Sequence, residues 1–366
     1  MPSRTATQES NSASILHEYR DEIKNQSIHP PGNDIVIQTC YQAFLNELQD
    51  ASVAQNFADI IAFREFTPAH FANILFRSIQ YIELYHRGKN NYPVGYDTTE
   101  IWRSELHSIL TTQFELLKTL LLSKDTTTTI YQRYAGSKIL LNAIFPNKPL
   151  AVADLGCGGN YGLPGLIKNK QFENIIDHTN NQRVSQLLTK KTDIISALAI
   201  DKENPYKNEA KQWRFSCSFY PHELQKTTEM ILPNGDESET IFTRIDLTEA
   251  ENDPTSMGIS PHSFDAVIMS TFLYQLKESQ IDIVMNFAKK IVKEKGIIII
   301  QDFAEKSKSD PEKIKLISNW FSMPFPYRTF ITGSLTGDTI KEILLWGNGR
   351  CREVSEGLDF EFIFSR

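Results

Sequence analysis

The sequence predicts an α/β fold in two parts, a helical N-terminal domain followed by a mostly parallel sheet with helices on both faces. Two observations predict this. As far as about residue 145, apolar residues recur at helical spacing. From Pro149 onward, short apolar runs alternate with helical segments, as is typical of parallel strands covered on both faces. We therefore expect a disordered polar tail at 1–14, a helical domain at 15–147 and a sheet domain at 148–366.

The N-terminal helices are predicted from their start signals. Thr67-Pro68 provides an N-cap and a proline at the first helical position, and apolar residues then recur until Gly88. Residues 97–100, Asp-Thr-Thr-Glu, resemble a capping box that opens a periodic stretch to Leu121. A third helical stretch runs over 130–145. We expect these helices to be structural, and whether they also cover a substrate is left open.

The second part is predicted to contain strands at regular intervals. A helix is expected over 279–293, and Asn234-Gly235 suggests a tight hairpin turn. Residues 174–177 lie in polar sequence that favours a helix. The apolar runs interpreted as strands are 150–154, 196–200, 240–245, 264–269, 296–300, 328–332, 342–346 and 360–364.

Charge and composition restrict the classes of function. The net charge is −7 with an isoelectric point near 5.7, which makes a nucleic-acid partner unlikely in the absence of a basic stripe. The polar N-terminus has no apolar signal core, and no apolar stretch approaches the ~18 residues of a membrane span. The four cysteines and eight histidines are too scattered for a metal motif. We expect a cytoplasmic protein without a metal or a membrane partner, and its oligomeric state is open.

A glycine-rich turn follows the first predicted strand. It reads Asp154-Leu155-Gly156-Cys157-Gly158-Gly159 and precedes a helix that carries Leu163 and Leu166. Glycines let the backbone approach a ligand closely, and a helix start presents unpaired N–H groups to an anion. The dinucleotide spacing G-x-G-x-x-G would require glycine at Tyr161. The turn therefore predicts a cofactor site, and its spacing disfavours a dinucleotide.

Residues 152–158, Val-Ala-Asp-Leu-Gly-Cys-Gly, resemble the first motif of class I S-adenosylmethionine-dependent methyltransferases, D-L-G-C-G-x-G. The resemblance extends over about 150–305. It implies a seven-stranded, mostly parallel, doubly wound sheet and S-adenosyl-L-methionine as the cofactor. Asn160 stands in place of the third glycine of the motif, and asparagine tolerates positive φ better than most residues.

The resemblance also implies roles for individual residues. No catalytic residue is predicted, because methyl transfer depends on positioning more than on acid–base groups. Cys157 is expected to be a small packed side chain rather than a nucleophile, and His262 is expected to be solvated. Thr271 is expected to line the reacting face with Ser270, and whether Arg133 and Tyr134 reach back to the cofactor from the preceding segment is left open. The predicted cofactor contacts are the turn residues Gly156, Cys157 and Gly158 with the carboxylate, Asp154 near the ammonium group, Asp201 with the ribose, Asp246 and Leu247 with the adenine, and Ser270 beside the reacting face.

The ribose acid has two candidates. The usual acid lies about 20 residues after the glycine turn, where this chain has Asp177. Asp201 lies about twice as far away, but it ends a buried apolar run and is the preferred candidate.

The predicted function is methyl transfer to a small-molecule or protein acceptor. The alternative is a cofactor-binding or interaction protein without catalytic activity, built on the same fold. A nucleotide-sugar or NAD enzyme on a related sheet is a further alternative. The sequence contains no recognised motif that would identify the acceptor.

Overall fold

The computed structural model describes residues 6–64, 66–88, 92–127, 130–218, 220–221, 240–249, 253–310, 312–316 and 327–365. The chain forms two compact units. The helical unit comprises Met1–Thr127 and Gln212–Pro233, and the sheet unit comprises Thr128–Lys211 and Asn234–Arg366. The helical unit thus ends about 20 residues before the expected boundary at 147, and it receives a second segment after the first strands. The reason is packing, since Ile139 and Leu140 lie in the core of the sheet, whereas Trp213 lies in the helical core.

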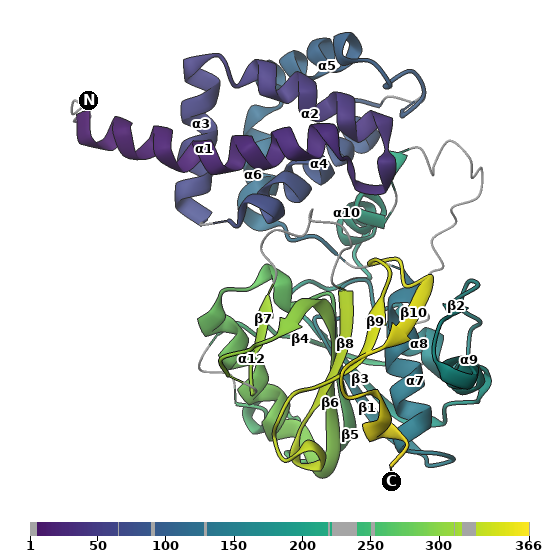
Figure 1. Cartoon of the computed structure of the whole chain (residues 1–366). Coiled ribbons are helices and arrows are strands. Elements are labelled where there is room, and N and C mark those ends of the chain that lie inside the picture. Colours follow the sequence, from purple (N-terminus) through teal and green to yellow (C-terminus); the bar gives the residue numbers. More distant parts are fainter. Residues whose placement is uncertain are drawn as a thin grey trace. The chain divides into compact units, whose positions relative to one another are not determined.

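The helical unit is built around α4, which is covered on all sides. Of its 18 residues, 14 are buried, which requires neighbouring elements to pack against every face of the helix. The predicted start is confirmed, because the Thr67 side chain accepts a hydrogen bond from the His70 N–H and Pro68 occupies the first position. The elements of this unit in Figure 1 are α1 (Ala6–Ile28), η1 (Pro31–Asn33), α2 (Ile35–Glu47), α3 (Ala51–Arg64), α4 (Pro68–Tyr85), α5 (Thr99–Thr112), α6 (Phe114–Ser123) and the end of α10 (Asn208–Ser218).

Three expectations for these helices are corrected. Helix α1 begins at Ala6, within the expected tail at 1–14, because no proline or glycine interrupts the chain before the packed residues Leu16 and Tyr19. The N-cap of α5 is Thr98 rather than Asp97, so residues 97–100 do not form the expected capping box. The stretch to Leu121 is divided at Gln113, whose φ of −129° and ψ of 15° end α5 and start α6.

The sheet confirms the predicted doubly wound fold. Its strand order is β2-β10-β9-β8-β6-β5-β1-β3-β4, with β7 paired to β6. Five neighbouring strands, in the spatial order β4-β3-β1-β5-β6, are mutually parallel. When these five are renumbered in chain order, their spatial order is the 3-2-1-4-5 of the Rossmann fold. Strands β8 and β9 continue the sheet in antiparallel pairs. The strands are β1 (Leu150–Leu155), β2 (Ile176–Asp177), β3 (Ile194–Asp201), β4 (Ile241–Arg244), β5 (Phe264–Ser270), β6 (Val292–Lys306), β7 (Ile314–Leu316), β8 (Tyr327–Thr332), β9 (Lys341–Trp346) and β10 (Glu353–Glu356).

The sheet has ten strands where seven were expected. The additions are β2, β7 and β10, which have two, three and four residues and are too short to give a period-two pattern. Strand β2 also corrects the expectation of a helix at 174–177. Residues 360–364, expected as a strand, form η7 (Phe360–Ile363), where Phe360 and Phe364 pack against the Arg183 guanidinium. The expected hairpin at Asn234-Gly235 lies outside the described residues.

Alternate side chains of the strands enter two separate cores. On β6, Ile297 and Ile299 belong to one core with α7, α8 and α9, whereas Ile298 and Ile300 belong to the other core with α12. This alternation explains the continuously apolar runs, because both faces of the sheet are covered (Figure 1). The remaining elements of the unit are η2 (Tyr131–Tyr134), α7 (Ala135–Ile144), α8 (Gly162–Ile167), η3 (Asn180–Gln182), α9 (Arg183–Thr189), η4 (Thr255–Met257), η5 (Leu273–Gln275), α12 (Glu278–Ile291) and η6 (Ser334–Thr336).

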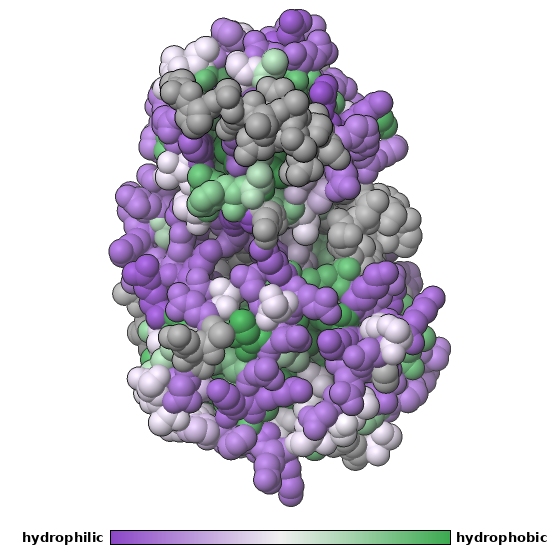
Figure 2. All heavy atoms as spheres, turned by 90° about the vertical axis from the view of Figure 1, so that its left-hand side faces the viewer, coloured by the Kyte–Doolittle hydropathy of each residue, from purple (hydrophilic) through white to green (hydrophobic). Residues whose placement is uncertain are grey.

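The outer surface is largely polar. On the face shown in Figure 2, hydrophilic residues predominate and hydrophobic residues form separate patches. Among the described residues, no helix combines the length and apolar character that a membrane crossing requires.

Candidate functional site

The candidate site lies where the direction of the chain through the sheet reverses. Strand β1 sits between β3 and β5. Among the five parallel strands, the chain forms β3 and β4 on one side of β1 and then returns to form β5 on the other side. In open α/β sheets, ligands bind outside the carboxyl ends of the strands at this switch point. Asp154, the glycine turn and Asp201 all lie at this edge, because Leu155 is in register with Ile200.

The glycine turn is a tight, internally bonded structure. Gly156, Gly158 and Asn160 have φ values of 70°, 54° and 49°, in the left-handed region that favours glycine and asparagine. The N–H groups of Gly156 and Cys157 both donate to the Ile200 carbonyl, at 2.9 and 3.1 Å. The Gly158 N–H donates to Asp201 Oδ2 at 2.8 Å. These three donors, expected to be free for a carboxylate, therefore have protein partners in this structure.

Phe272 explains why residue 156 is glycine. A Cβ atom built on Gly156 would lie 2.4 Å from Cγ of the Phe272 ring. The Phe272 segment is itself fixed, because the N–H groups of Phe272, Leu273 and Tyr274 all donate to Oδ2 of Asp302, at 2.8–3.2 Å. Burial raises the pKa of Asp302 to about 6, against the opposing effect of these hydrogen bonds. The loop after β5 is thus held against the glycine turn.

Asp154 is a fully buried acid with one unused oxygen. The Tyr134 hydroxyl donates to Asp154 Oδ2 at 2.7 Å, whereas Oδ1 has no hydrogen-bond partner among the described residues. Burial raises the pKa of Asp154 to about 7, the Tyr134 hydrogen bond lowers it, and the charge of Asp201 raises it. A buried acceptor without a donor is costly, so this oxygen marks a place where a donor group would be stabilised.

Asp201 lies directly across the turn from Asp154, as expected from the preference for it over Asp177. Its Oδ2 accepts from Gly158 and its Oδ1 accepts from the Glu203 N–H at 3.1 Å. Burial raises the pKa of Asp201 to about 6, although the residue keeps some solvent exposure. The carboxylate is therefore placed beside the turn and remains within reach of a ligand.

Asp177 lies on the terminal strand β2, at the far side of the sheet from β3 and β4. It ends β2, which pairs only with β10, six positions from β1 in the strand order. Its carboxylate accepts from the N–H and hydroxyl groups of both Thr179 and Ser185, and these hydrogen bonds hold its pKa below the usual value against burial. Asp177 is thus a local cap for the start of α9.

The remaining predicted cofactor contacts lie at different distances from the glycine turn. Ser270 ends β5 at the same edge, is buried and donates to the Arg133 carbonyl at 3.3 Å. Asp246 follows β4, beyond β3, and its Oδ1 accepts from the N–H and hydroxyl of Thr248. Leu247 is buried in the core beneath α12. The structure therefore brings Asp154, the turn, Asp201 and Ser270 together and places Asp246 and Leu247 one strand further away.

Asn160 ties the turn to two other segments. Its side-chain amide donates to the Tyr206 hydroxyl at 2.9 Å and to the Thr240 hydroxyl at 2.7 Å. Tyr206 follows β3 and Thr240 directly precedes β4. The asparagine that replaces the third glycine of the motif thus retains the positive φ and adds cross-links that glycine could not form.

The segment of Arg133 and Tyr134, considered from the sequence as one that could reach back to the cofactor, forms a strap that crosses the carboxyl edge. The four residues of η2 each contact a different element: the Tyr131 ring packs on Gly165, Gln132 donates to the Cys351 carbonyl, Arg133 donates to the Gly349 carbonyl, and Tyr134 donates to Asp154. The strap precedes the glycine motif and has no motif of its own. Its only sequence signal is the aromatic and polar run Tyr-Gln-Arg-Tyr directly before a helix.

Sequence reasoning placed Thr271 at the reacting face but missed its partner Tyr327, and the two hydroxyl oxygens lie 2.6 Å apart. Thr271 has a φ of 55°, a costly conformation for a β-branched residue. Both residues are buried at the carboxyl edge, after β5 and at the start of β8. This strained position adjoins the predicted reacting face at Ser270.

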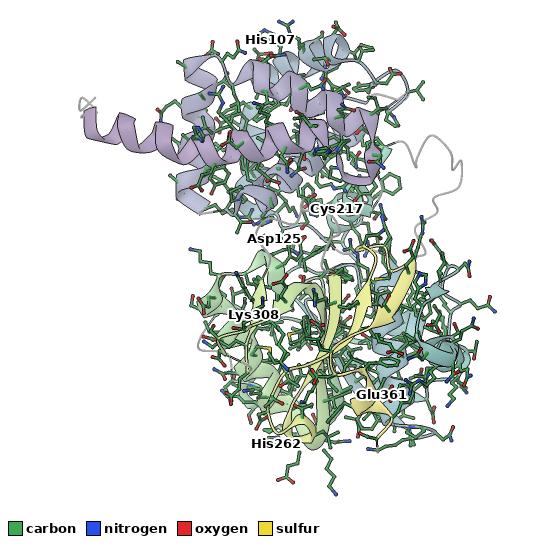
Figure 3. The ribbon with its side chains drawn as sticks, viewed as in Figure 1. His107, Asp125, Cys217, His262, Lys308 and Glu361 are labelled. Carbon is green, nitrogen blue, oxygen red and sulfur yellow. The ribbon has the colours of Figure 1, made fainter. Side chains whose placement is uncertain are left out.

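Other candidate groups are not at this edge or are not reactive. Burial raises the pKa of the Cys157 thiol, and Asp201 and Asp154 raise it further, which disfavours a thiolate nucleophile. His262 lies in the loop before β5, at the amino ends of the strands (Figure 3). It helps to line a surface hollow of about 650 Å³ with Lys289 and Lys290. Within the described part of the chain, no three His, Cys, Asp or Glu side chains are grouped to hold a metal.

Comparisons with known proteins give matches in structure only. No protein-family model matches the chain, and no curated protein matches it either. One solved structure with similarity is the Haloferax volcanii complex between the Trm112 methyltransferase activator and its assigned methyltransferase, at 16% identity, 47% of this chain, 53% of that chain and a TM-score of 0.27. This chain thus spans about half the length of that one.

Two further solved structures are similar to a comparable degree. A TehB-like S-adenosylmethionine-dependent methyltransferase from Corynebacterium glutamicum is 15% identical over 54% of this chain and 72% of that one, with a TM-score of 0.26. The Burkholderia thailandensis 1,6-didemethyltoxoflavin-N1-methyltransferase, solved with S-adenosylhomocysteine, is 11% identical over 66% and 72%, with a TM-score of 0.26. At such TM-scores nothing about the activity of this chain follows from these proteins, and its fold class follows from its own strand order.

Proposed function

We propose that this protein is an S-adenosylmethionine-dependent methyltransferase. The observation that carries the proposal is the buried Asp154, with one unused oxygen, beside a positive-φ glycine turn at the switch point of a doubly wound sheet. The motif resemblance and this placement point to the same ligand. A cofactor with an ammonium group at one end and ribose hydroxyls further along could place the ammonium group at Asp154 and the hydroxyls at Asp201.

The residues at the carboxyl edge fit the parts of this cofactor unequally. Asp154 suits a cationic donor, and Asp201 suits hydroxyl donors because a carboxylate can accept two further hydrogen bonds. The N–H groups of Gly156 and Cys157 are bonded to Ile200, so we expect the turn to contribute shape rather than a carboxylate cradle. We retain Asp246 and the Leu247 N–H as the proposed adenine contacts, and Ser270 as the residue beside the reacting face.

The chemistry requires positioning rather than acid–base catalysis. When bound, S-adenosyl-L-methionine supplies a methyl group on a positively charged sulfur, which a nucleophilic atom of an acceptor can attack. The protein's contribution is to hold the two reactants in line, which can be worth about 7–11 kcal/mol in favourable cases. The buried residues around Ser270 and Thr271 exclude water from this edge.

We propose a small molecule or a protein side chain as the acceptor. The support is the acidic balance of the chain, since the net charge of −7 opposes a polyanionic acceptor. Among the described residues at the carboxyl edge, none selects between these two acceptor classes.

The function is tested by incubating the purified protein with methyl-labelled cofactor and a cell extract, and then measuring label in the small-molecule, protein and nucleic-acid fractions. We expect label in one of the first two fractions, and we expect it to persist in a chelator. In the D201N variant we expect cofactor affinity to fall about 10- to 100-fold, as for loss of charge-assisted hydrogen bonds. The matched control is D177N, which removes an acid that accepts more hydrogen bonds than Asp201 but lies on β2, at the other side of the sheet.

Three results would contradict this account. Equal loss of affinity in D177N and D201N would show that the effect is structural. Label confined to nucleic acid would refute the proposed acceptor class. Tight cofactor binding without transfer to any fraction would favour the non-catalytic alternative.

A further inference from the structure

Among the described residues, the Tyr134 hydroxyl is the one hydrogen-bond donor to the fully buried Asp154 carboxylate, and its surroundings fix it in that position. Tyr134 is 3% exposed, and its hydroxyl donates to Asp154 Oδ2 at 2.7 Å. A Cβ atom on Gly162 would lie 2.0 Å from the Tyr134 ring, so the first residue of α8 is shaped to receive this ring. Because the ring is held by packing, the direction of the hydroxyl is fixed as well.

The hydrogen bond determines which oxygen of Asp154 remains available. With Oδ2 occupied by Tyr134, Oδ1 is the acceptor left without a partner among the described residues. The titratable groups that face this pair are Asp201 from β3, Cys157 from the turn and Tyr327 from β8. None of them is a cation, so the site holds an acid whose counter-charge must come from elsewhere.

We infer that Tyr134 is a positioning residue, which orients Asp154 so that its second carboxylate oxygen binds the ammonium group of the ligand's amino-acid end. This inference rests on the proposed function and deepens it. A carboxylate hydrogen-bonded on one side and unpaired on the other recognises a cationic donor, and it discriminates against ligands that lack one.

The inference predicts a dependence of affinity on pH that a structural role would not produce. Asp154 must be ionised to bind an ammonium group, so affinity for S-adenosylhomocysteine should increase as the pH rises through about 7, the pKa of Asp154. Removing the Tyr134 hydroxyl withdraws an interaction that lowers this pKa. The rise should then occur at a higher pH than in the wild type.

The test is calorimetry with the wild type and Y134F between pH 5.5 and about 8.5, using S-adenosylhomocysteine and 5′-methylthioadenosine, which lacks the amino-acid end. We expect Y134F to bind S-adenosylhomocysteine about tenfold more weakly at pH 7 and to bind 5′-methylthioadenosine as the wild type does. The matched control is Y131F, from the same strap, whose hydroxyl instead donates to the Lys170 carbonyl at 3.2 Å. Y131F should behave as the wild type does with both ligands.

The outcomes separate this inference from the proposed function. If the wild type binds neither ligand, the proposed function fails. If the wild type binds both and Y134F has the same affinities and pH profile, the role of Tyr134 is refuted and the proposed function stands. Equal weakening of both ligands in Y134F would indicate damage to the fold and would likewise overturn the inference.

Discussion

Substitution of Gly156 by alanine is expected to weaken cofactor binding at least 30-fold. Two effects act together at this position. A non-glycine residue at a φ of 70° costs roughly 1–2 kcal/mol. The new Cβ atom would also overlap the Phe272 ring, whose backbone is held by Asp302, and such overpacking typically costs about 1–3 kcal/mol. The turn or the loop after β5 must therefore move, and both adjoin the proposed cofactor site.

Gly258 provides a matched control for this substitution. Its φ is 74°, close to that of Gly156, but no atom would lie within 4 Å of an added Cβ. G258A should therefore show the backbone cost alone and leave cofactor affinity unchanged. In the G156A background, F272A should restore part of the lost affinity, because it removes the overlap. Unchanged affinity in G156A would mean that the turn does not shape the cofactor site.

The second large effect is a dependence of stability on pH that arises from Asp154. Burial raises its pKa to about 7, whereas in the unfolded chain it titrates near 4. Between these values the folded protein retains a proton that the unfolded chain has released. The free energy of unfolding should therefore fall as the pH rises from about 4 to 7, by at most about 1.4 kcal/mol per pH unit from this group.

The contribution of Asp154 can be isolated with the D154N variant. Asp201 and Asp302, whose pKa values are each raised to about 6, add slopes of the same sign in both proteins and cancel in the difference. We expect the wild type to lose on the order of 3 kcal/mol relative to D154N between pH 4.5 and 7.5, measured by denaturant unfolding of each protein without ligand. Parallel pH profiles for the two proteins would show that Asp154 is not held protonated by burial.

Much of the sheet could be predicted because its strands are buried on both faces. The runs at 150–154, 264–269 and 296–300 are mostly apolar, and each lies within a strand that feeds two cores. Asp201 was preferred as the ribose acid for the same reason, since it directly follows the buried apolar run 197–200 of β3. In contrast, β2 has two residues and an exposed isoleucine, so its sequence could not be distinguished from a polar helix.

The details of the site could not be predicted, because they depend on contacts between segments that lie far apart in the sequence. Tyr134 reaches Asp154 from a turn that precedes α7, and Phe272 reaches Gly156 from the loop after β5. Neither contact has a spacing rule. The domain boundary was misplaced for a related reason, since the apolar face of 135–144 does not show which core it enters.

The central claim, that the site binds S-adenosylmethionine, is tested most directly by calorimetry of the wild-type protein with three ligands: S-adenosylmethionine, S-adenosylhomocysteine and NAD. The structure places an unpaired carboxylate oxygen and a second acid at the switch point, and the turn lacks dinucleotide spacing. We predict saturable binding of the first two ligands with one site per chain, and no binding of NAD. Binding of NAD alone would contradict the account.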